Sequence, residues 1–353
     1  MNNRGLYIHV PFCVRKCPYC DFYSLPGKTA LYSSYAQAVV RNLARYDEPF
    51  DTVYFGGGTP NLIAPYMAEI LSAVNIAPGA EITSECNPAS ATQETLAQMR
   101  KARINRLSIG VQSLQDGELK KLGRLHTAAE AETLILAAAE AGFGSISADV
   151  MLGVPGQTAE SLTGTLERLG KLPVQHISAY MLTLEPATPF GKEPPSGMAD
   201  DEEMADLYAL CQRLCGELGF HQYEISNFAR EGFQCRHNLK YWRDEEYLGI
   251  GAAAHSFYEG KRFAVPKDLR RFIAEPRQTE EITDDSPGDY DERVMMGLRL
   301  AEGIPEELYK PLLPGLKLLP PEYWSLENGR LRLTAAGFPV YNYIVSLLLA
   351  HRE

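Results

Sequence analysis

Short runs rich in β-branched residues alternate with longer runs of Ala, Leu and Glu from the start of the chain to about Leu218. The longer runs have a helical period, and this alternation is typical of a parallel α/β domain in which helices cover a sheet. The runs that we predict as buried strands are 6–10, 52–56, 81–85, 106–111, 146–152 and 176–182. Strand–helix units in this number predict a partial (β/α)6 barrel, which we assign to residues 1–220.

Glycine and proline residues stand just beyond the ends of several of these strands. They are Gly56, Gly57, Gly58, Pro60, Pro88, Gly153 and Pro155. In barrels of parallel strands, the loops at the C-terminal ends of the strands build the active site. We therefore expect the chemistry of this chain at that rim.

The chain changes character after the barrel. Residues 221–274 are richer in Tyr, Phe and Trp and predict a β extension of the sheet. The polar, acidic stretch 275–290 suits a surface linker. Beyond it, 287–353 predicts a helix, a hairpin that turns at Asn328-Gly329 and a further helix, which is the order of a small winged-helix-like α+β domain. Few basic residues occur there, which favours a packing or protein-contact module over a DNA-binding one.

Charge and cysteine usage narrow the class of function. The formal net charge is −11 and the pI is about 5.3, so we expect no protein-wide attraction to nucleic acid. No apolar segment with a small-residue cleavage site precedes the first strand, so we expect no secretory signal. Seven cysteines, three of them close together, favour a reducing compartment, and we expect a cytoplasmic protein. The apolar run 340–350 is too short to span a bilayer; it permits a homodimer or a peripheral membrane contact but requires neither.

Three cysteines follow the first predicted strand with the spacing C-x3-C-x2-C, at Cys13, Cys17 and Cys20. Thiolates at this density suit zinc or an iron–sulfur cluster. A structural zinc site normally takes four protein ligands, and no fourth Cys or His lies nearby in the sequence. Three ligands on a [4Fe-4S] cluster would leave one iron open. The remaining cysteines are more simply explained as small buried hydrophobic residues.

The triad, with Tyr19 before its last cysteine, resembles the radical S-adenosylmethionine (SAM) superfamily. This resemblance implies that the amino and carboxylate groups of SAM chelate the open iron, and that an electron from the cluster can break the sulfonium C–S bond. The stretch YFGGGTPN alone would be an ordinary tight turn. After the triad it resembles the superfamily's glycine motif, which implies that Gly57, Gly58 and Thr59 meet the methionyl part of the cofactor.

Four polar residues lie at or near the ends of the later strands: Glu85, Gln112, Arg124 and Asp149. Each alone is explained by an ordinary buried salt bridge or hydrogen bond. Together they supply acceptors for ribose hydroxyls and a guanidinium for a carboxylate. With YIHVPFC, these motifs resemble the oxygen-independent coproporphyrinogen III oxidase branch of the superfamily. The resemblance implies that Tyr7 points toward the sulfonium and that Arg124 pairs with the cofactor carboxylate, while the other three contact the nucleoside.

Two features depart from the oxidase of that branch. The oxidase has a further cysteine two residues after its third cluster ligand, where this chain has Phe22. The oxidase also carries an N-terminal extension that contributes to turnover, whereas this sequence begins shortly before its first strand. We therefore expect no oxidase activity.

Residues 237–242 read HNLKYW and resemble the HNxxYW motif of the HemW-type heme chaperones of this branch. Imidazole is a common axial ligand of heme iron, and aromatic side chains offer flat apolar faces to a porphyrin. Cys235 is a second conceivable iron ligand. Without the resemblance, the segment would suit an amphipathic surface or a domain seam. With it, we expect heme to be bound by His237, Asn238, Tyr241 and Trp242.

Three functions are compatible with these residues. The favoured one is a heme chaperone that delivers heme to respiratory proteins, with the cluster and SAM regulating or driving the transfer and a donor such as flavodoxin supplying electrons. The second is an oxygen-independent coproporphyrinogen III oxidase, which performs a radical oxidative decarboxylation in porphyrin biosynthesis. The third is a protein-interaction module with zinc or no metal at the cysteines. Whether SAM is cleaved productively stays open.

Overall fold

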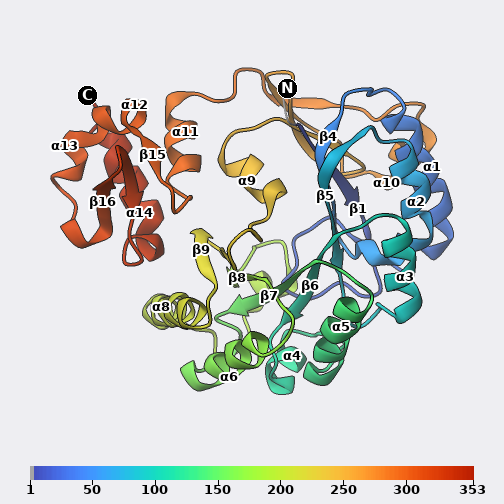
Figure 1. The fold of residues 1–353 in the computed structure, drawn as a ribbon, viewed down its shortest axis with the longest axis horizontal. Helices are drawn as coiled ribbons and strands as arrows, with labels where there is room; N and C mark the ends of the chain where they lie inside the picture. The colour runs from blue at the N-terminus through green and yellow to red at the C-terminus, as the bar shows by residue number, and fades with distance from the viewer. Residues whose placement is uncertain (1–3) are drawn as a thin grey trace.

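The structure is a computed structural model that describes residues 4–353, and within them the central element is one sheet of twelve strands (Figure 1). The strands in its middle run parallel and follow one another in chain order: β1 (Arg4–Val10), β4 (Phe50–Gly57), β5 (Ile76–Cys86), β6 (Arg106–Gln112), β7 (Ser145–Leu152) and β8 (His176–Met181). Each strand predicted from the sequence of the barrel is one of these. The predicted partial (β/α)6 barrel is confirmed.

The two faces of these strands carry different residues. On β1, Leu6 and Ile8 are fully buried in the large hydrophobic core. The intervening Tyr7 faces inward, where a Cβ on Gly56 of the neighbouring β4 would lie 2.8 Å from its ring. Because side chains alternate along a strand, one face packs against helices while the other lines a polar interior. The inward face is therefore the one that can supply a site.

Helices after the strands cover the outer face of the sheet (Figure 1): α1 (Tyr32–Leu43), α2 (Ala64–Ser72), α3 (Gln93–Lys101), α4 (Asp116–Lys121), α5 (Ala128–Glu140), α6 (Ala159–Gly170) and α8 (Asp201–Glu217). The short α7 (Pro189–Lys192) instead packs against the loop after β1, where Phe190 N donates to Pro18 O. Capping boxes at Thr127, Thr158 and Asp200 begin α5, α6 and α8. Such boxes satisfy N–H groups that the first helical turn leaves free. The helix starts are therefore encoded locally.

The segment 221–274 supplies strands to both edges of the sheet rather than to one. Beyond β8 lie two antiparallel strands, β10 (Asn227–Ala229) and β9 (His221–Glu224). On the other side, β1 pairs in parallel with β11 (Tyr247–Ile250), which is followed by antiparallel β12 (His255–Tyr258) and β13 (Lys261–Ala264). Two helices belong to the same segment, α9 (Arg236–Trp242) and α10 (Leu269–Ala274).

Part of the expected linker 275–290 is a strand. Residues of β14 (Glu281–Asp284) pair antiparallel with β13 at the edge of the sheet. The linker prediction is wrong for these residues. All the side chains of β14 are exposed, so no apolar alternation marks it in the sequence, and only its backbone pairing defines it.

The C-terminal part is a small α+β module: α11 (Tyr290–Gly297), β15 (Ile304–Pro305), α12 (Glu306–Tyr309), α13 (Leu313–Leu316), β16 (Trp324–Glu327), β17 (Arg330–Leu333) and α14 (Tyr341–Ala350). The turn between β16 and β17 has φ of +52° at Asn328 and +72° at Gly329. Asn-Gly is favoured where both turn residues need positive φ, and the predicted hairpin is confirmed. The module lies beside α9 and β9 (Figure 1), and Ile225 N donates to Arg299 O across the seam.

Within residues 4–353, no helix combines the length and the apolar composition needed to cross a membrane.

Candidate cluster and cofactor site

The three cysteines lie in a loop that follows β1. Its short strand β2 (Phe12–Cys13) pairs in parallel with β3 (Leu25–Pro26), which closes the loop on itself. Inside the loop, Cys20 N donates to Cys17 O at 3.2 Å. All three cysteines of the triad are free thiols and partly exposed.

Two side chains from other loops contact these sulfurs. Thr59, just after β4, donates from Oγ1 to Cys13 Sγ at 3.4 Å. Arg124, after α4, donates from Nη1 to Cys17 Sγ at 3.8 Å. Burial raises the pKa of Cys20, and the neighbouring Cys13 and Cys17 thiols raise it further. The structure therefore brings the triad together with Thr59 and Arg124.

Backbone approaches the triad closely at Gly58. A Cβ there would lie 2.5 Å from Phe12 O and 3.1 Å from Cys13 Sγ, so the position requires glycine.

Among residues 4–353, no three His, Cys, Asp or Glu side chains converge on the position of a single ion. A [4Fe-4S] cluster does not require such convergence, because each thiolate binds a different iron. The residues present fit a cluster on three sulfurs.

Arg124 has a hydrogen-bond donor to spare. Its Nη2 donates to Gly110 O at 2.8 Å and to Asn87 Oδ1 at 3.3 Å. Its Nε is buried and has no partner among the described residues. A guanidinium with an unused donor beside the triad suits a ligand carboxylate. This geometry fits the predicted pairing of Arg124 with the carboxylate of SAM.

Gln112 ends β6 in the left-handed conformation, with φ of +67°. The register between β6 and β7 shifts at the same place. A Cβ on Gly110 would lie 3.1 Å from Gln112 Nε2 and 3.4 Å from Arg124 Nη2. Such a φ is uncommon for a residue with a side chain and occurs often at functional sites. The bend places the Gln112 amide next to Arg124.

Two carboxyl groups lie inside the barrel. Glu85 on β5 accepts hydrogen bonds from Gly57 N at 3.1 Å and from Tyr54 OH at 3.2 Å. Burial raises the pKa of Glu85 to about 8, and the charge of Asp149 adds to the rise. Asp149 on β7 accepts from Ser108 Oγ at 2.8 and 3.1 Å, and burial raises its pKa to about 6. The two predicted residues therefore share one electrostatic environment.

The hydroxyl of Tyr7 is oriented by a histidine that we did not predict. His9 Nε2 lies 2.9 Å from Tyr23 O, and a backbone carbonyl only accepts, so Nε2 carries the proton. His9 Nδ1 then accepts from Tyr7 OH at 3.0 Å. His9 and Tyr54 were missed, although both alternate with buried apolar residues on their strands. Reading every second residue of each strand as one inward face would have found them.

Tyr19 packs beside the triad rather than into solvent. Its ring centroid lies 6.3 Å from that of Phe190, and Phe190 N donates to Pro18 O at 3.1 Å. Burial raises the pKa of Tyr19, while nearby Arg124 lowers it. The aromatic residue of the triad therefore lies close to the predicted cofactor arginine.

The HNLKYW segment forms α9, and its histidine is fully buried. His237 Nδ1 lies 2.8 Å from Thr52 Oγ1, and Nε2 lies 2.9 Å from Tyr241 OH. The ring stacks on Tyr54, with centroids 5.2 Å apart, and burial lowers the pKa of His237 to about 3. Both ring nitrogens of this neutral imidazole are engaged, so ligation of heme iron requires α9 to give up at least one contact. That His237 binds heme stays a prediction.

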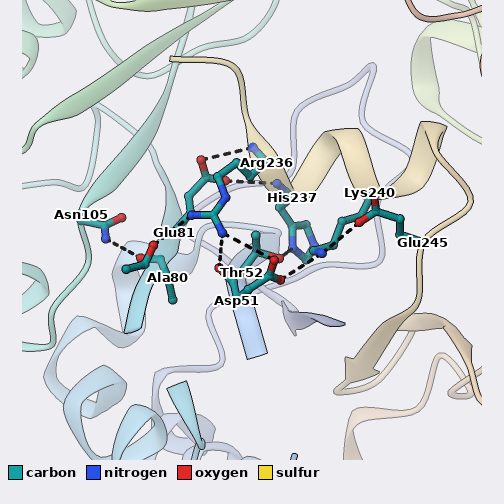
Figure 2. Close-up of polar contacts among 10 residues, drawn as sticks. Asp51, Thr52, Ala80, Glu81, Asn105, Arg236, His237, Lys240 and Glu245 are labelled. Carbon is teal, nitrogen blue, oxygen red and sulfur yellow. Dashed lines mark hydrogen bonds and ion pairs between the residues drawn. The ribbon is translucent and has the colours of Figure 1, made fainter. Parts of the chain in front are cut away.

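Charged residues at the start of β4 and at the position of β5 that pairs with it hold α9 in place (Figure 2). Glu81 accepts from Arg236 N at 3.2 Å and from His237 N at 3.1 Å. Asp51 pairs with Lys240 at 3.0 Å and with Arg236 at 3.5 Å. These contacts lie at the N-terminal ends of the parallel strands, whereas the cysteines follow a C-terminal end. The structure therefore does not bring HNLKYW to the triad.

The other predicted heme-binding residues are partly exposed: Asn238, Tyr241 and Trp242. Trp242, at the end of α9, lies under the guanidinium of Arg299, whose carbon is 4.3 Å from the ring centroid. Cys235 is buried, and burial raises the pKa of its thiol to about 12, which disfavours a thiolate ligand.

Comparison with known proteins adds a family context to this geometry. The sequence profile of the Radical SAM superfamily matches residues 7–169. The heme chaperone HemW of Escherichia coli is 34% identical over 94% of this chain and 96% of that protein, and HemW of Haemophilus influenzae is 36% identical over 87% and 85%. The solved structure of coproporphyrinogen III oxidase (HemN) from Escherichia coli superposes with a TM-score of 0.83 at 18% identity, covering 98% of this chain and 90% of that one. At that identity the likeness shows a shared fold.

Proposed function

We infer the function of this chain from its family: the chain belongs to the heme chaperones named HemW, within the radical SAM superfamily. We propose that it binds heme, carries a [4Fe-4S] cluster with SAM, and delivers heme to respiratory proteins. One observation carries the proposal. The similarity to the Escherichia coli chaperone extends over 94% of this chain, far beyond the residues 7–169 that the superfamily profile covers.

Cys13, Cys17 and Cys20 would hold the cluster. When bound, the cluster supplies an electron and SAM supplies the sulfonium C–S bond that this electron can break. The chain's own part is to position SAM. Arg124 offers its unpartnered Nε to the carboxylate. Further proposed contacts are Tyr7, Tyr19, Gly57, Gly58, Thr59, Glu85, Gln112 and Asp149.

Compartment and partners follow from the same proposal. Free cysteines at the rim suit the reducing cytoplasm. An electron donor such as flavodoxin would reduce the cluster, and respiratory proteins would accept the heme. The segment 221–274 with HNLKYW is the proposed heme-contact region, joined to the barrel 1–220 and the module 287–353.

Coproporphyrinogen III oxidase activity is the second candidate, favoured by the shared fold with HemN. At position 22 this chain carries Phe22, 66% exposed, where the oxidase has a cysteine. We expect that anaerobic incubation of the reconstituted protein with coproporphyrinogen III yields no protoporphyrinogen at a catalytic rate. We also expect heme to bind and produce its own absorption band. Turnover at a catalytic rate would contradict the proposed chaperone function. Absence of heme binding would contradict the same proposal independently.

The affinity for SAM should rise with pH through the range where Glu85 ionises. The pKa of Glu85 is about 8 in the folded chain, against an ordinary value of 4.5, because the carboxyl is buried. The ionised form accepts hydrogen bonds more strongly and attracts the sulfonium cation. We therefore expect SAM to bind about tenfold more tightly at pH 8.5 than at pH 6.5, measured by anaerobic calorimetry.

The Glu85→Gln variant provides the control, because it keeps the size of the side chain and removes its titration. Its affinity for SAM should change little between the two pH values. The free energy of unfolding should depend on pH in the opposite direction from the affinity for SAM. Folded Glu85 holds its proton more tightly than unfolded Glu85, so ionising it lowers the free energy of unfolding as pH rises from about 4.5 to about 8. An equal pH dependence of SAM affinity in both proteins would contradict the assignment of Glu85.

A further inference from the structure

Two segments beside the triad form a basic surface on an acidic chain. Residues 14–28, which belong to the cysteine loop, and residues 115–127, which follow β6, together hold six Lys and Arg residues against three Asp and Glu residues. The whole chain has 34 against 45. The segments lie in contact, because Arg15 donates to Gly123 O and a Cβ on Gly123 would lie 3.0 Å from Pro18 Cδ. We call their joint surface the triad surface.

The exposed cations of the triad surface are not neutralised by carboxylates. Arg15, Lys16 and Lys121 donate to backbone carbonyl oxygens, which carry no net charge. Lys120 is exposed, and no lysine ion pair within residues 4–353 includes it. These four charges therefore stay available to a partner.

The acids of the two segments cancel only part of this charge. Glu118 is 5% exposed and accepts hydrogen bonds from the hydroxyls of Ser113 and Ser161, both at 2.6 Å. Asp116 is exposed and accepts from the first N–H of α5 at 2.8 Å. Asp21 is the third acid and is exposed. Cations therefore predominate at the surface.

Exposed apolar side chains lie among these charges. Val14, Phe22 and Leu125 are each at least 50% exposed. Apolar groups that are bordered by polar residues on a surface are typical of protein contact sites. Phe22 is the most exposed of the large apolar residues within residues 4–353. The position at which this chain departs from the oxidase therefore adds an apolar contact to the cysteine loop.

A hollow of about 490 Å³ opens in the triad surface. Arg15 lines it from the cysteine loop, Lys120 from the last turn of α4, and Arg124 and Leu125 from the segment that follows. Arg124 also donates to Cys17 Sγ at 3.8 Å. A single side chain therefore joins the hollow to a thiol of the triad.

We propose that the triad surface docks a small acidic protein that carries one electron at a time and passes it to the cluster. This inference rests on the proposed function, which requires an electron donor, and locates the donor's contact on this chain. One electron would leave the reduced group of the donor and enter the cluster. No bond forms or breaks in this step, and no proton moves.

Charge and location together favour this partner. A chain with a net charge of −11 repels an acidic protein over most of its surface and attracts it where cations predominate. Electron transfer also requires a short distance, and the triad surface includes the cysteine loop itself. An anionic lipid surface would match the same cations, but it would gain nothing from lying beside the triad.

The test measures the binding of flavodoxin, an acidic one-electron carrier, to the full chain with its cluster reconstituted, by anaerobic calorimetry. Lys120→Glu should weaken binding about fivefold at an ionic strength of about 0.01 M. This difference should shrink as ionic strength rises to about 0.15 M, because the screening length falls from about 30 Å to about 8 Å. Lys317→Glu, the same change at an exposed lysine of the C-terminal module, should bind as the wild type does.

Phe22→Ser tests the apolar part of the triad surface. It should weaken flavodoxin binding about tenfold, by a factor that changes little with ionic strength, because salt does not screen the burial of an apolar ring. Dithionite, a small reductant that needs no docking surface, should still reduce the cluster completely in every variant. This control shows that a variant has kept its cluster.

The outcomes separate the triad surface from the function on which it rests. Wild-type affinity and salt dependence in both Lys120→Glu and Phe22→Ser would overturn the triad surface. So would wild-type protein that binds phosphatidylglycerol vesicles through Lys120 but binds no flavodoxin, since the surface would then contact lipid. Neither result bears on heme. The proposed function fails separately, if the chain binds no hemin or holds no cluster that dithionite reduces.

Discussion

Serine at any one of Cys13, Cys17 or Cys20 should remove nearly all iron and the brown colour from the protein. The chain offers three thiolates to the cluster, so each loss leaves two. A serine oxygen is a hard ligand and replaces a soft thiolate poorly on iron–sulfur clusters. The measurement is the iron and sulfide content per chain after anaerobic reconstitution, together with the absorption spectrum.

Cys235→Ser is the matched control for that experiment. The Cys235 sulfur lies 3.6 Å from Glu81 Oε1, so a serine hydroxyl at this position finds an acceptor and does not stay unpaired. This variant should keep its iron. If all three rim variants keep wild-type iron and colour, the triad is not the cluster site, and the SAM contacts built around it lose their basis.

Lys240→Met should lower the free energy of unfolding by about 3 kcal/mol. Lys240 Nζ pairs with Asp51 Oδ1 at 3.0 Å, and the side chains are only 4% and 14% exposed. Removing one partner of a buried pair leaves the other charge uncompensated, which typically costs about 3–5 kcal/mol. Asp51 keeps a contact with Arg236 at 3.5 Å, so the decrease in the free energy of unfolding should lie at the lower end of this range. Urea unfolding of the metal-free chain, followed by circular dichroism, measures it.

Lys310→Met makes the same substitution in an exposed pair. Lys310 and Glu306 are 64% and 55% exposed, so this variant should stay within about 1 kcal/mol of wild type. Adding Asp51→Asn to Lys240→Met removes the carboxylate charge that Lys240 no longer pairs with. The double variant should therefore recover part of the lost free energy of unfolding. Equal stability of the two single methionine variants would show that the pair under α9 is not shielded from water.

The strands of the barrel and the rim could be predicted because each depends on a short stretch of sequence. A β-branched run bounded by glycine or proline defines a buried strand within a few residues. The parallel order then places Gly58, Glu85 and Arg124 at one end of the sheet. The strand β14 escaped prediction for the opposite reason, since its exposed side chains carry no apolar pattern.

The sequence identified the residues of the candidate site better than it identified their contacts, as α9 illustrates. The letters HNLKYW identified the segment, yet they could not show that His237 points to Thr52, which lies 185 positions earlier in the chain. Nor could they show that Trp242 alone among the four lines a cleft with residues of the C-terminal module. Which partners a helix meets depends on the packing of every element between them.

The sequence by itself determined the barrel strands and the residues able to hold a cluster, because local periodicity and ligand chemistry act over a few neighbouring residues. Only the tertiary structure decided that His237 is fully buried against Thr52 of β4 while Trp242 lies beside residues of the C-terminal module. Burial and partnership over long separations are set when the whole chain packs, and that information is spread over the entire sequence.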